Sequence, residues 1–249
     1  MIDLSGKTIL VTGGSRGIGA AIVRVLAAAG AEVVLHYGQS QAEAQKVARE
    51  AGRCHLVRAD LAQPGAARAL WREALAWKGH IDVLVNNAGI APSAGVEDEL
   101  ERWSGVWNET LQVNLLSLAD LCREAIRHYR ARGGGILINM ASRAAFRGDN
   151  PDMMHYAASK GAVVALTKSI ARGFGREGIL AYGVAPGWVE TEMAADYIRL
   201  HAADIARDIP IGRVAPPQDV AYTVAFLAAG LVPHMTGATL DINGASYVR

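Results

Sequence analysis

Short apolar segments with strand character alternate with longer helical segments along almost the whole chain. A strand, a helix and the next strand form a right-handed crossover unit, and repeated units build a parallel sheet with helices on both faces. The strand segments are apolar throughout rather than at every second position, as in strands that are buried on both sides. The pattern predicts an α/β fold, a doubly wound parallel sheet of about seven strands in three α/β/α layers.

The expected strands cover residues 8–11, 32–35, 55–57, 81–85, 135–140, 179–184 and 238–242. The expected helices cover residues 18–29, 41–50, 64–77, 100–132, 156–176, 190–208 and 218–229. We expect the fourth helix to break near Ser104 and Gly105, and Pro64 to open the third, because proline suits a first helical position. No repeat or Pro/Ser-rich linker divides the chain, so residues 1–249 are expected to form one domain.

The composition excludes several classes of protein. The chain is 51% hydrophobic, so it can bury a core, and its 25 basic and 24 acidic residues nearly cancel. That balance argues against nucleic acid or anionic lipid as the main partner. Cys54 and Cys122 lie too far apart for metal-ligand spacing, and the scattered histidines form no cluster, so no metal is expected. The start of the chain lacks a signal-peptide pattern, which favours the cytoplasm.

A glycine-rich turn follows the first expected strand and opens a helix. It reads Thr-Gly-Gly-Ser-Arg-Gly-Ile-Gly over residues 12–19. Glycines at this place let the backbone approach a pyrophosphate, and the helix N-terminus supplies positive potential. The context predicts a dinucleotide site in a Rossmann-type sheet, although the spacing differs from the common Gly-x-Gly-x-x-Gly.

The second expected strand lacks an acid at its end. An NAD site commonly places Asp or Glu there to bind the ribose 2′-hydroxyl, and residues 35–40 read Leu-His-Tyr-Gly-Gln-Ser. Arg16 in the glycine-rich turn could bind a 2′-phosphate instead. The alternatives are that Arg16 is a solvated loop residue, or that His36, Tyr37 or Ser40 holds the phosphate. Together these residues favour NADP(H) over NAD(H).

Two further strand ends carry candidate cofactor residues. Asp60 and Leu61 follow the third strand and could contact the adenine, or Asp60 could cap a helix. Asn86, Asn87, Ala88 and Gly89 follow the fourth strand, as a wall along the cofactor or as an ordinary turn.

Four polar residues carry the expected chemistry. Tyr156 and Lys160 are four apart on one helix, so they share a face, and a nearby ammonium stabilises a phenolate. Ser142 follows the fifth strand and could hold a substrate oxygen, or act as a turn serine. Asn114 lies in an apolar helix, either as structural glue or as the holder of a water.

With these motifs the sequence resembles the short-chain dehydrogenase/reductase family over essentially its whole length. The resemblance implies a tetrad in which Tyr156 is the general acid/base and Lys160 binds the nicotinamide ribose and lowers the Tyr pKa. Ser142 orients the reacting oxygen, and Asn114 positions a water. The cofactor contacts that the motifs and the resemblance imply are Gly13, Ser15, Arg16, Gly17, Ile18, Gly19, His36, Tyr37, Asp60, Leu61, Asn87, Ala88, Gly89, Tyr156, Lys160, Pro186, Gly187, Val189 and Thr191.

The implied reaction passes a hydride between nicotinamide and a carbonyl or secondary alcohol. Within the family the chain looks most like the 3-oxoacyl-thioester reductases that act on acyl carrier protein, with sugar or polyol dehydrogenases as the alternative. A non-catalytic dinucleotide sensor is the third hypothesis, which the intact tetrad opposes. The stretch from Trp188 to Pro210 is expected to cover the substrate, with Met153, Met154, Trp188, Met193, Tyr197 and Ile198 offering contacts. His155 is expected to pack or line the rim.

Two surface interactions are also expected. Arg130, Arg132, Arg172 and Arg176 could form a basic patch for an acidic carrier protein, or simply complement helix ends. The helices around residues 111–130 and 157–176 are apolar on more than one face, which predicts a homo-oligomer, a tetramer in this family. The residues that suggest this are Leu115, Leu116, Leu118, Leu121, Val163, Val164, Leu166 and Ile170.

Overall fold

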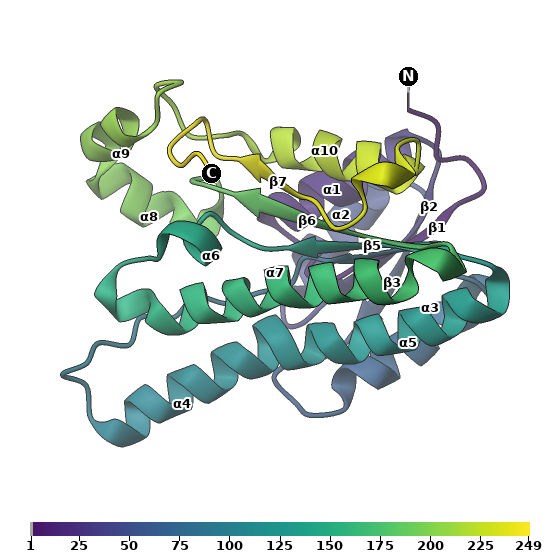
Figure 1. Ribbon diagram of the computed structural model, residues 1–249, viewed down its shortest axis with the longest axis horizontal. Helices are drawn as coiled ribbons and strands as arrows, with labels where there is room; N and C mark the ends of the chain where they lie inside the picture. The colour runs from purple at the N-terminus through teal and green to yellow at the C-terminus, as the bar shows by residue number, and fades with distance from the viewer. Residues whose placement is uncertain (1) are drawn as a thin grey trace.

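Seven parallel strands form one sheet in the order β3-β2-β1-β4-β5-β6-β7 (Figure 1). The computed structural model describes residues 2–249, except the side chains of residues 193, 194, 196 and 197. The strands are β1 Thr8–Val11, β2 Glu32–Tyr37, β3 Cys54–Arg58, β4 Val83–Asn86, β5 Gly135–Met140, β6 Ile179–Pro186 and β7 Thr239–Ile242. The predicted α/β fold with about seven parallel strands is confirmed.

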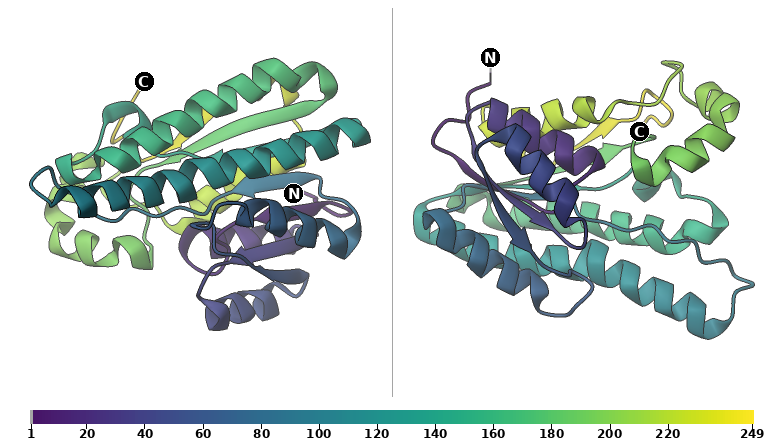
Figure 2. Two further views of the ribbon diagram at one scale, coloured as in Figure 1. Left: turned by 90° about the horizontal axis from the view of Figure 1, so that it is seen from below. Right: turned by 180° about the vertical axis from the view of Figure 1, so that it is seen from behind.

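Helices cover both faces of the sheet, as the views of Figure 2 show. On one face α1 (Gly17–Ala28), α2 (Gln41–Ala51) and α10 (Pro217–Ala229) bury a core that includes Leu26 and Val224. On the other, α3 (Ala66–Lys78), α5 (Ser117–Arg132) and α7 (Met154–Phe174) bury a second core around Leu121 and Val163. Burial on both faces explains why the strands are apolar throughout.

The strand order places a candidate site at one edge of the sheet. The chain runs outward from β1 to β3, then returns to β4 beside β1 and continues to β7. In such sheets ligands bind beyond the carboxyl ends of the strands, where the order reverses. The loops after β1, β4, β5 and β6 therefore meet at the predicted site. Beside them lie α8 (Glu192–Leu200) and α9 (Ala202–Asp208), at the left in Figure 1.

The predicted break in the fourth helix was misplaced. The helix continues through Ser104 and Gly105 as α4 (Leu100–Leu111) and then widens into a π-helical turn, η1 (Gln112–Leu116), before α5 begins. A π turn inserts extra backbone without ending the helix, and such turns often occur at functional sites. The turn here contains Asn114.

Other boundaries also differ from the predictions. Pro64 precedes α3 rather than opening it, because Gly65 in a left-handed conformation (φ 85°) separates the two. The expected helix over 190–208 is two helices, α8 and α9. A short helix, α6 (Ala144–Arg147), was not predicted. No helix among the described residues has the length and hydropathy needed to cross a membrane.

Candidate functional site

The glycine-rich turn joins β1 to α1 with unusually close backbone contacts. A Cβ atom at Gly19 would lie 2.0 Å from the carbonyl oxygen of Gly13, and one at Gly13 would lie 3.0 Å from Cα of Ala88. Ser15 is buried in this turn and Ile18 is partly buried in the first turn of α1. The turn therefore has no room for side chains at Gly13 and Gly19, at the N-terminus of α1 where a pyrophosphate site would lie.

Two of the three candidate phosphate ligands at the end of β2, His36 and Tyr37, have other roles, whereas Ser40 is a partly exposed residue at the start of α2 whose side chain makes no capping hydrogen bond. The Nδ1 atom of His36 accepts a hydrogen bond from the Gly13 amide (3.1 Å), and its Nε2 lies 3.0 Å from the Ala59 carbonyl oxygen. Burial lowers the pKa of His36 to about 4, so the ring is neutral. Tyr37 is 8% exposed and packs in the core. His36 therefore supports the glycine-rich turn and Tyr37 the core, rather than presenting exposed groups to a phosphate.

Arg16 is exposed beside the same loop. It is the N-cap residue of α1, in an extended conformation. Among the described residues no hydrogen bond or ion pair engages its guanidinium, which leaves it available to an anion at the helix N-terminus.

Thr12 ties the loop after β4 to the glycine-rich turn, a role that the sequence analysis missed. Its hydroxyl accepts hydrogen bonds from the amides of Asn87 (2.9 Å) and Ala88 (3.0 Å). The Asn87 side chain donates back to the carbonyls of Thr12 and Gly13. A threonine that ends a buried strand directly before a glycine loop was the available signal.

Asp60 organises its own turn after β3. Its carboxylate accepts from the Ala62 amide (3.1 Å) and the Gln63 side chain (3.4 Å). Leu61 is 6% exposed. The helix-capping alternative for Asp60 is wrong, because the N-cap residue of α3 is Gly65 and Asp60 caps only the turn before it.

Ser142 lies beside Tyr156 at the carboxyl end of β5. Burial raises the pKa of the Tyr156 phenol, and the neighbouring Ser142 hydroxyl opposes the rise. The Ser142 hydroxyl also accepts the amide of Ala144 (3.2 Å), so the turn-serine role and the partnership with Tyr156 coexist. The Tyr156 phenol and the Ser142 hydroxyl thus lie together beyond β5, where one substrate oxygen could contact both.

Lys160 lies one helical turn beyond Tyr156 and is 4% exposed. Its Nζ donates to the Met140 carbonyl (2.8 Å) and lies 5.7 Å from the centroid of the Tyr156 ring. Burial lowers the pKa of Lys160 to about 8, which makes this ammonium a readily titrated group.

Asn114 is fixed by three hydrogen bonds. Its Oδ1 accepts the Ile90 amide (2.8 Å), and its Nδ2 donates to the Ile90 carbonyl (2.9 Å) and to the Ser159 hydroxyl (3.2 Å). The structure therefore shows the structural-glue alternative. The amide remains near the expected chemistry, because a Cβ at Gly89 would lie 3.3 Å from its Oδ1 and 3.5 Å from Nζ of Lys160.

The segment after β6 completes the site. Pro186 ends the strand, and the Val189 bridge to Ala215 uses the flanking Trp188 carbonyl and Glu190 amide. Thr191 returns to the glycine loop, since a Cβ at Gly17 would lie 3.2 Å from its Cγ2. The side chains of Met193 and Tyr197 lie outside the described part of the structure.

A buried polar network lies beneath the site, between the sheet and α5 and α7. Asn86 donates to the Asn139 side chain (2.9 Å) and to the sulfur of Cys122 (3.4 Å), and Asn139 donates to Thr167 (2.9 Å). Burial raises the pKa of the Cys122 thiol to about 12. A thiol in this state packs as a neutral group rather than reacting or binding metal.

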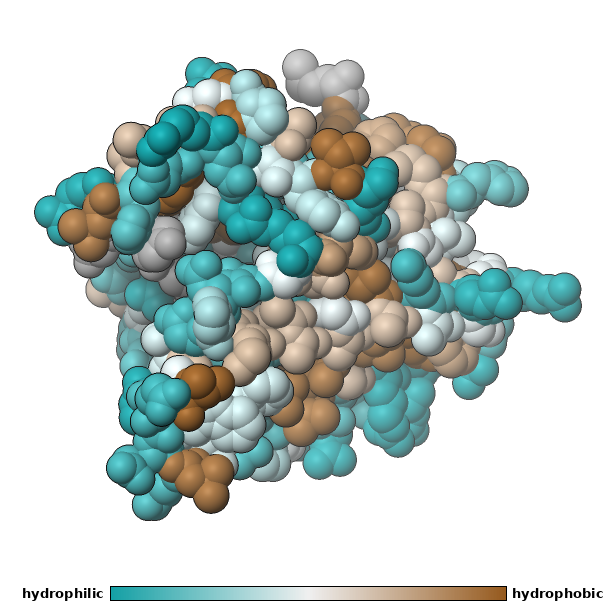
Figure 3. Space-filling model, turned by 60° about the vertical axis from the view of Figure 1, so that its left-hand side comes forward, coloured by the Kyte–Doolittle hydropathy of each residue, from teal (hydrophilic) through white to brown (hydrophobic). Residues whose placement is uncertain are grey.

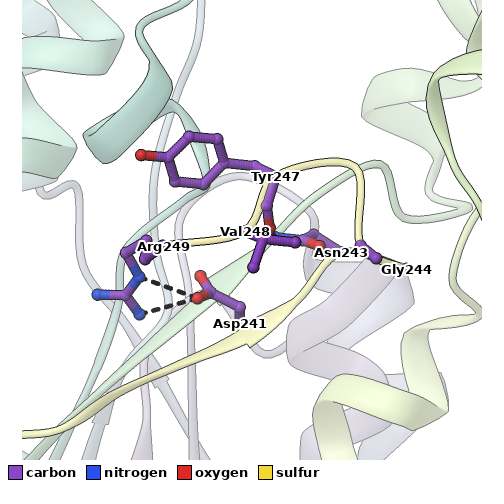
Figure 4. Close-up of a pocket in the computed structure, with 7 residues that line it drawn as sticks. Asp241, Asn243, Gly244, Tyr247, Val248 and Arg249 are labelled. Atoms are coloured by element: carbon purple, nitrogen blue, oxygen red, sulfur yellow. Dashed lines mark hydrogen bonds and ion pairs between the residues drawn. The ribbon is translucent and has the colours of Figure 1, made fainter.

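The C-terminal turn lies beside α6, at the same end of the molecule. Arg249 forms an ion pair with Asp241 (2.9 Å), drawn in Figure 4, and its guanidinium lies over the Phe146 ring. A hollow of about 480 Å³ in this turn contains none of the tetrad residues in its lining. Its lining residues are Asp241, Asn243, Gly244, Ala245, Tyr247, Val248 and Arg249.

Two other expectations, for His155 and for the basic patch, have clear outcomes in the geometry. His155 is fully buried and packs on Trp107, as a packing residue. Arg130 pairs with Glu177 and Arg132 with Asp82, so half of the proposed basic patch is neutralised. Among the described residues no group of three or more His, Cys, Asp or Glu side chains could hold a metal.

Comparisons with known proteins agree with this geometry. A family model described as enoyl-(acyl carrier protein) reductase matches residues 13–245. The chain is 36% identical to 3-oxoacyl-[acyl-carrier-protein] reductase FabG of Chlamydia pneumoniae, over 98% of each chain. It is 36% identical to 3beta-hydroxysteroid dehydrogenase 1 of Eggerthella lenta, over 97% of this chain and 94% of that protein. A putative NAD(P)-dependent gluconate 5-dehydrogenase from Beutenbergia cavernae, with bound NADP at low occupancy, superposes with a TM-score of 0.90 at 35% identity over 98% of both chains.

Proposed function

This chain belongs to the short-chain dehydrogenase/reductase family, and from that premise we propose that it is an NADP(H)-preferring enzyme that interconverts a carbonyl and a secondary alcohol. Residues 1–249 act as one dinucleotide-binding domain. The observation that carries the proposal is the buried Lys160, whose Nζ donates to the Met140 carbonyl at the carboxyl end of β5 and lies 5.7 Å from the centroid of the Tyr156 ring, with Ser142 beside Tyr156.

The residues present fit the dinucleotide. The close contact between Gly13 and Gly19 leaves no room for side chains in the turn at the N-terminus of α1, where a pyrophosphate would bind. The Arg16 guanidinium, which has no partner among the described residues, would bind the 2′-phosphate. Asp60 and Leu61 would border the adenine, and Asn87 to Gly89 the ribose. Pro186, Gly187, Val189 and Thr191 would hold the nicotinamide. When bound, the cofactor supplies or accepts the hydride at C4 of its nicotinamide.

The protein's own groups handle the proton. In the reductive direction Ser142 and Tyr156 hold the carbonyl oxygen, and the Tyr156 hydroxyl donates its proton to that oxygen. The Lys160 ammonium stabilises the phenolate that remains and binds the ribose. Asn114, held by Ile90 and Ser159, fixes the wall of the site beside Lys160.

For the substrate we propose a 3-oxoacyl thioester, in line with the Chlamydia pneumoniae relative. The alternative is a sugar acid or polyol, which the gluconate 5-dehydrogenase structures favour. If an acyl carrier protein is the partner, the exposed Arg172 and Arg176 are the cations left to meet it, since Arg130 and Arg132 are paired.

The decisive experiment measures cofactor oxidation and reduction by the change in nicotinamide absorbance. The purified protein is given NADPH or NADH with an acetoacetyl thioester, a keto sugar acid and simple ketones, and NADP with the matching alcohols. Tyr156→Phe serves as the control, because it removes only the transferable proton and keeps the ring. We expect turnover by the wild type and its loss in Tyr156→Phe, with NADPH binding retained. A tenth or more of wild-type activity in this variant would exclude Tyr156 as the acid/base.

We also propose a cytoplasmic homotetramer. Cys54 and Cys122 are free thiols, which suits a reducing compartment. Part of the oligomer argument needs correction, because Leu118, Leu121, Val163, Val164 and Ile170 are buried in the core. What remains is a groove of about 410 Å³ between α5 and α7, whose apolar lining includes Ile126, Leu166 and Phe174. Figure 3 shows hydrophobic residues across the middle of the molecule, at the level of these helices.

A further inference from the structure

Arg143, the residue directly after Ser142, has a buried side chain that contacts three distant segments. It is 7% exposed. Its Nη1 donates to Oδ2 of Asp208 in α9 (3.0 Å) and to the hydroxyl of Ser246 in the C-terminal turn (2.5 Å). Its guanidinium carbon lies 5.6 Å from the centroid of the Trp188 ring.

The backbone and stem of Arg143 are fixed at the catalytic end of the sheet. Its amide donates to the Pro186 carbonyl (3.0 Å), and a Cβ at Gly187 would lie 3.4 Å from its Cδ. The residue therefore lies between Ser142 on the proposed substrate side and Gly187 on the proposed nicotinamide side. A displacement of Arg143 would therefore change the positions of both Ser142 and Gly187.

The ion pair has a physical reason to hold. A buried guanidinium is costly unless it is paired, and Asp208 supplies the carboxylate. Arg147 reaches the same Oδ2 at 3.4 Å, so one carboxylate of α9 serves two arginines of the α6 segment. Without Asp208 these two neighbouring cations would lose the carboxylate that they share. Burial and the charge of Arg147 already lower the pKa of Arg143.

The Ser246 contact is equally well formed. Its hydroxyl accepts from Arg143 and donates to the Asn243 carbonyl (2.8 Å), so both of its roles are used. The C-terminal turn is thus attached to the α6 segment at Arg143, and Arg249 adds a second attachment over the Phe146 ring.

We propose that Arg143 is a positioning residue that holds α9 and the C-terminal turn against the catalytic end of the sheet, and thereby sets how firmly the segment over residues 188–210 covers the proposed substrate site. The proposal rests on the proposed function only where substrate turnover is the readout. It predicts that the Arg143–Asp208 pair controls substrate affinity more than the chemical step.

The first test compares two charge-equivalent variants of α9. Asp208→Asn removes the partner of Arg143, whereas Asp204→Asn removes an exposed carboxylate that pairs with Arg207 of the same helix. Hydrogen exchange of the amides of residues 202–209, measured without substrate, should quicken about tenfold in Asp208→Asn and little in Asp204→Asn, as expected for a lost charged hydrogen bond. Equal exchange in both variants would overturn the proposal, whether or not the protein turns over any substrate.

The second test separates positioning from general destabilisation. Arg143→Met keeps the stem length and removes the charge, and Arg143→Lys keeps the charge without the planar fork. With a substrate identified, Asp208→Asn should raise its KM about tenfold and change kcat less than twofold. In the double variant Arg143→Met/Asp208→Asn, the amides of residues 202–209 should exchange no faster than in the single variant with the faster exchange. In Arg143→Lys these amides should be better protected than in Arg143→Met. Additive effects of the two single changes would refute a direct coupling.

Discussion

At the scale of single residues, the most informative feature of the site is the Arg16 guanidinium, which has no partner among the described residues. Arg16 is the exposed cation beside a loop that has no acid, while His36 and Tyr37 are committed to the fold. We expect the wild type to prefer NADPH, and Arg16→Ala to weaken NADPH binding about tenfold to hundredfold, because a charged hydrogen bond contributes roughly 1.5–3 kcal/mol. NADH binding should change little. Dissociation constants from cofactor fluorescence check this, and an equal loss for both cofactors would contradict the phosphate contact.

Lys160 gives a second prediction at this scale. Its folded pKa of about 8 lies below the usual lysine value of 10.5, because its ammonium is buried. Between these values the unfolded chain binds more protons, so the stability contributed by this group rises with pH across that interval. The free energy of unfolding of Lys160→Met relative to the wild type should therefore fall by roughly 1–3 kcal/mol from about pH 7.5 to about pH 10. Urea titrations at both pH values test it, and a constant difference would show that Lys160 is not desolvated.

At the scale of elements, the Asn114 side chain links the π turn η1 to the loop after β4 and to α7. Asn114→Ala removes three hydrogen bonds and leaves the Ile90 amide and carbonyl without partners. We expect a loss of about 1–3 kcal/mol in unfolding free energy, because unpaired buried groups are costly. Asn108→Ala, at an exposed position of α4, is the control and should have little effect. Matching denaturation midpoints for the two variants would mean that Asn114 does not hold the turn.

The same element shows where sequence reasoning succeeds and fails. Strand positions could be predicted, because uninterrupted apolar runs are local patterns. The catalytic roles of the tetrad, which the family resemblance implies, stay predictions. The π turn could not be predicted, since it depends on Asn114 meeting Ile90 and Ser159 across the fold. The roles of His36 and Arg143 were hidden for the same reason, as their partners Ala59 and Asp208 are distant in sequence.

At the scale of the whole molecule, the groove between α5 and α7 is the face that we expect a second copy to cover. Symmetric pairing would remove its apolar lining from water. Leu166→Asp places a charge in the groove and should lower the particle mass measured by light scattering, whereas Leu200→Asp, at an exposed position outside the groove lining, should not. A wild-type particle with the 26.3 kDa mass of one chain, at micromolar concentration, would sink the oligomer hypothesis.

The buried network under the site contains a cysteine whose reactivity can measure local opening of the structure. Cys122 is 2% exposed, and burial keeps its thiol protonated at any ordinary pH. Cys122 also lines the groove between α5 and α7, so an alkylating reagent reaches its sulfur when the packing around α5 opens. The labelling rate of this one atom therefore measures how often that packing opens. Cofactor bound beyond the carboxyl end of β4 should slow the labelling, since ligand binding to the closed form lowers the population of the open one.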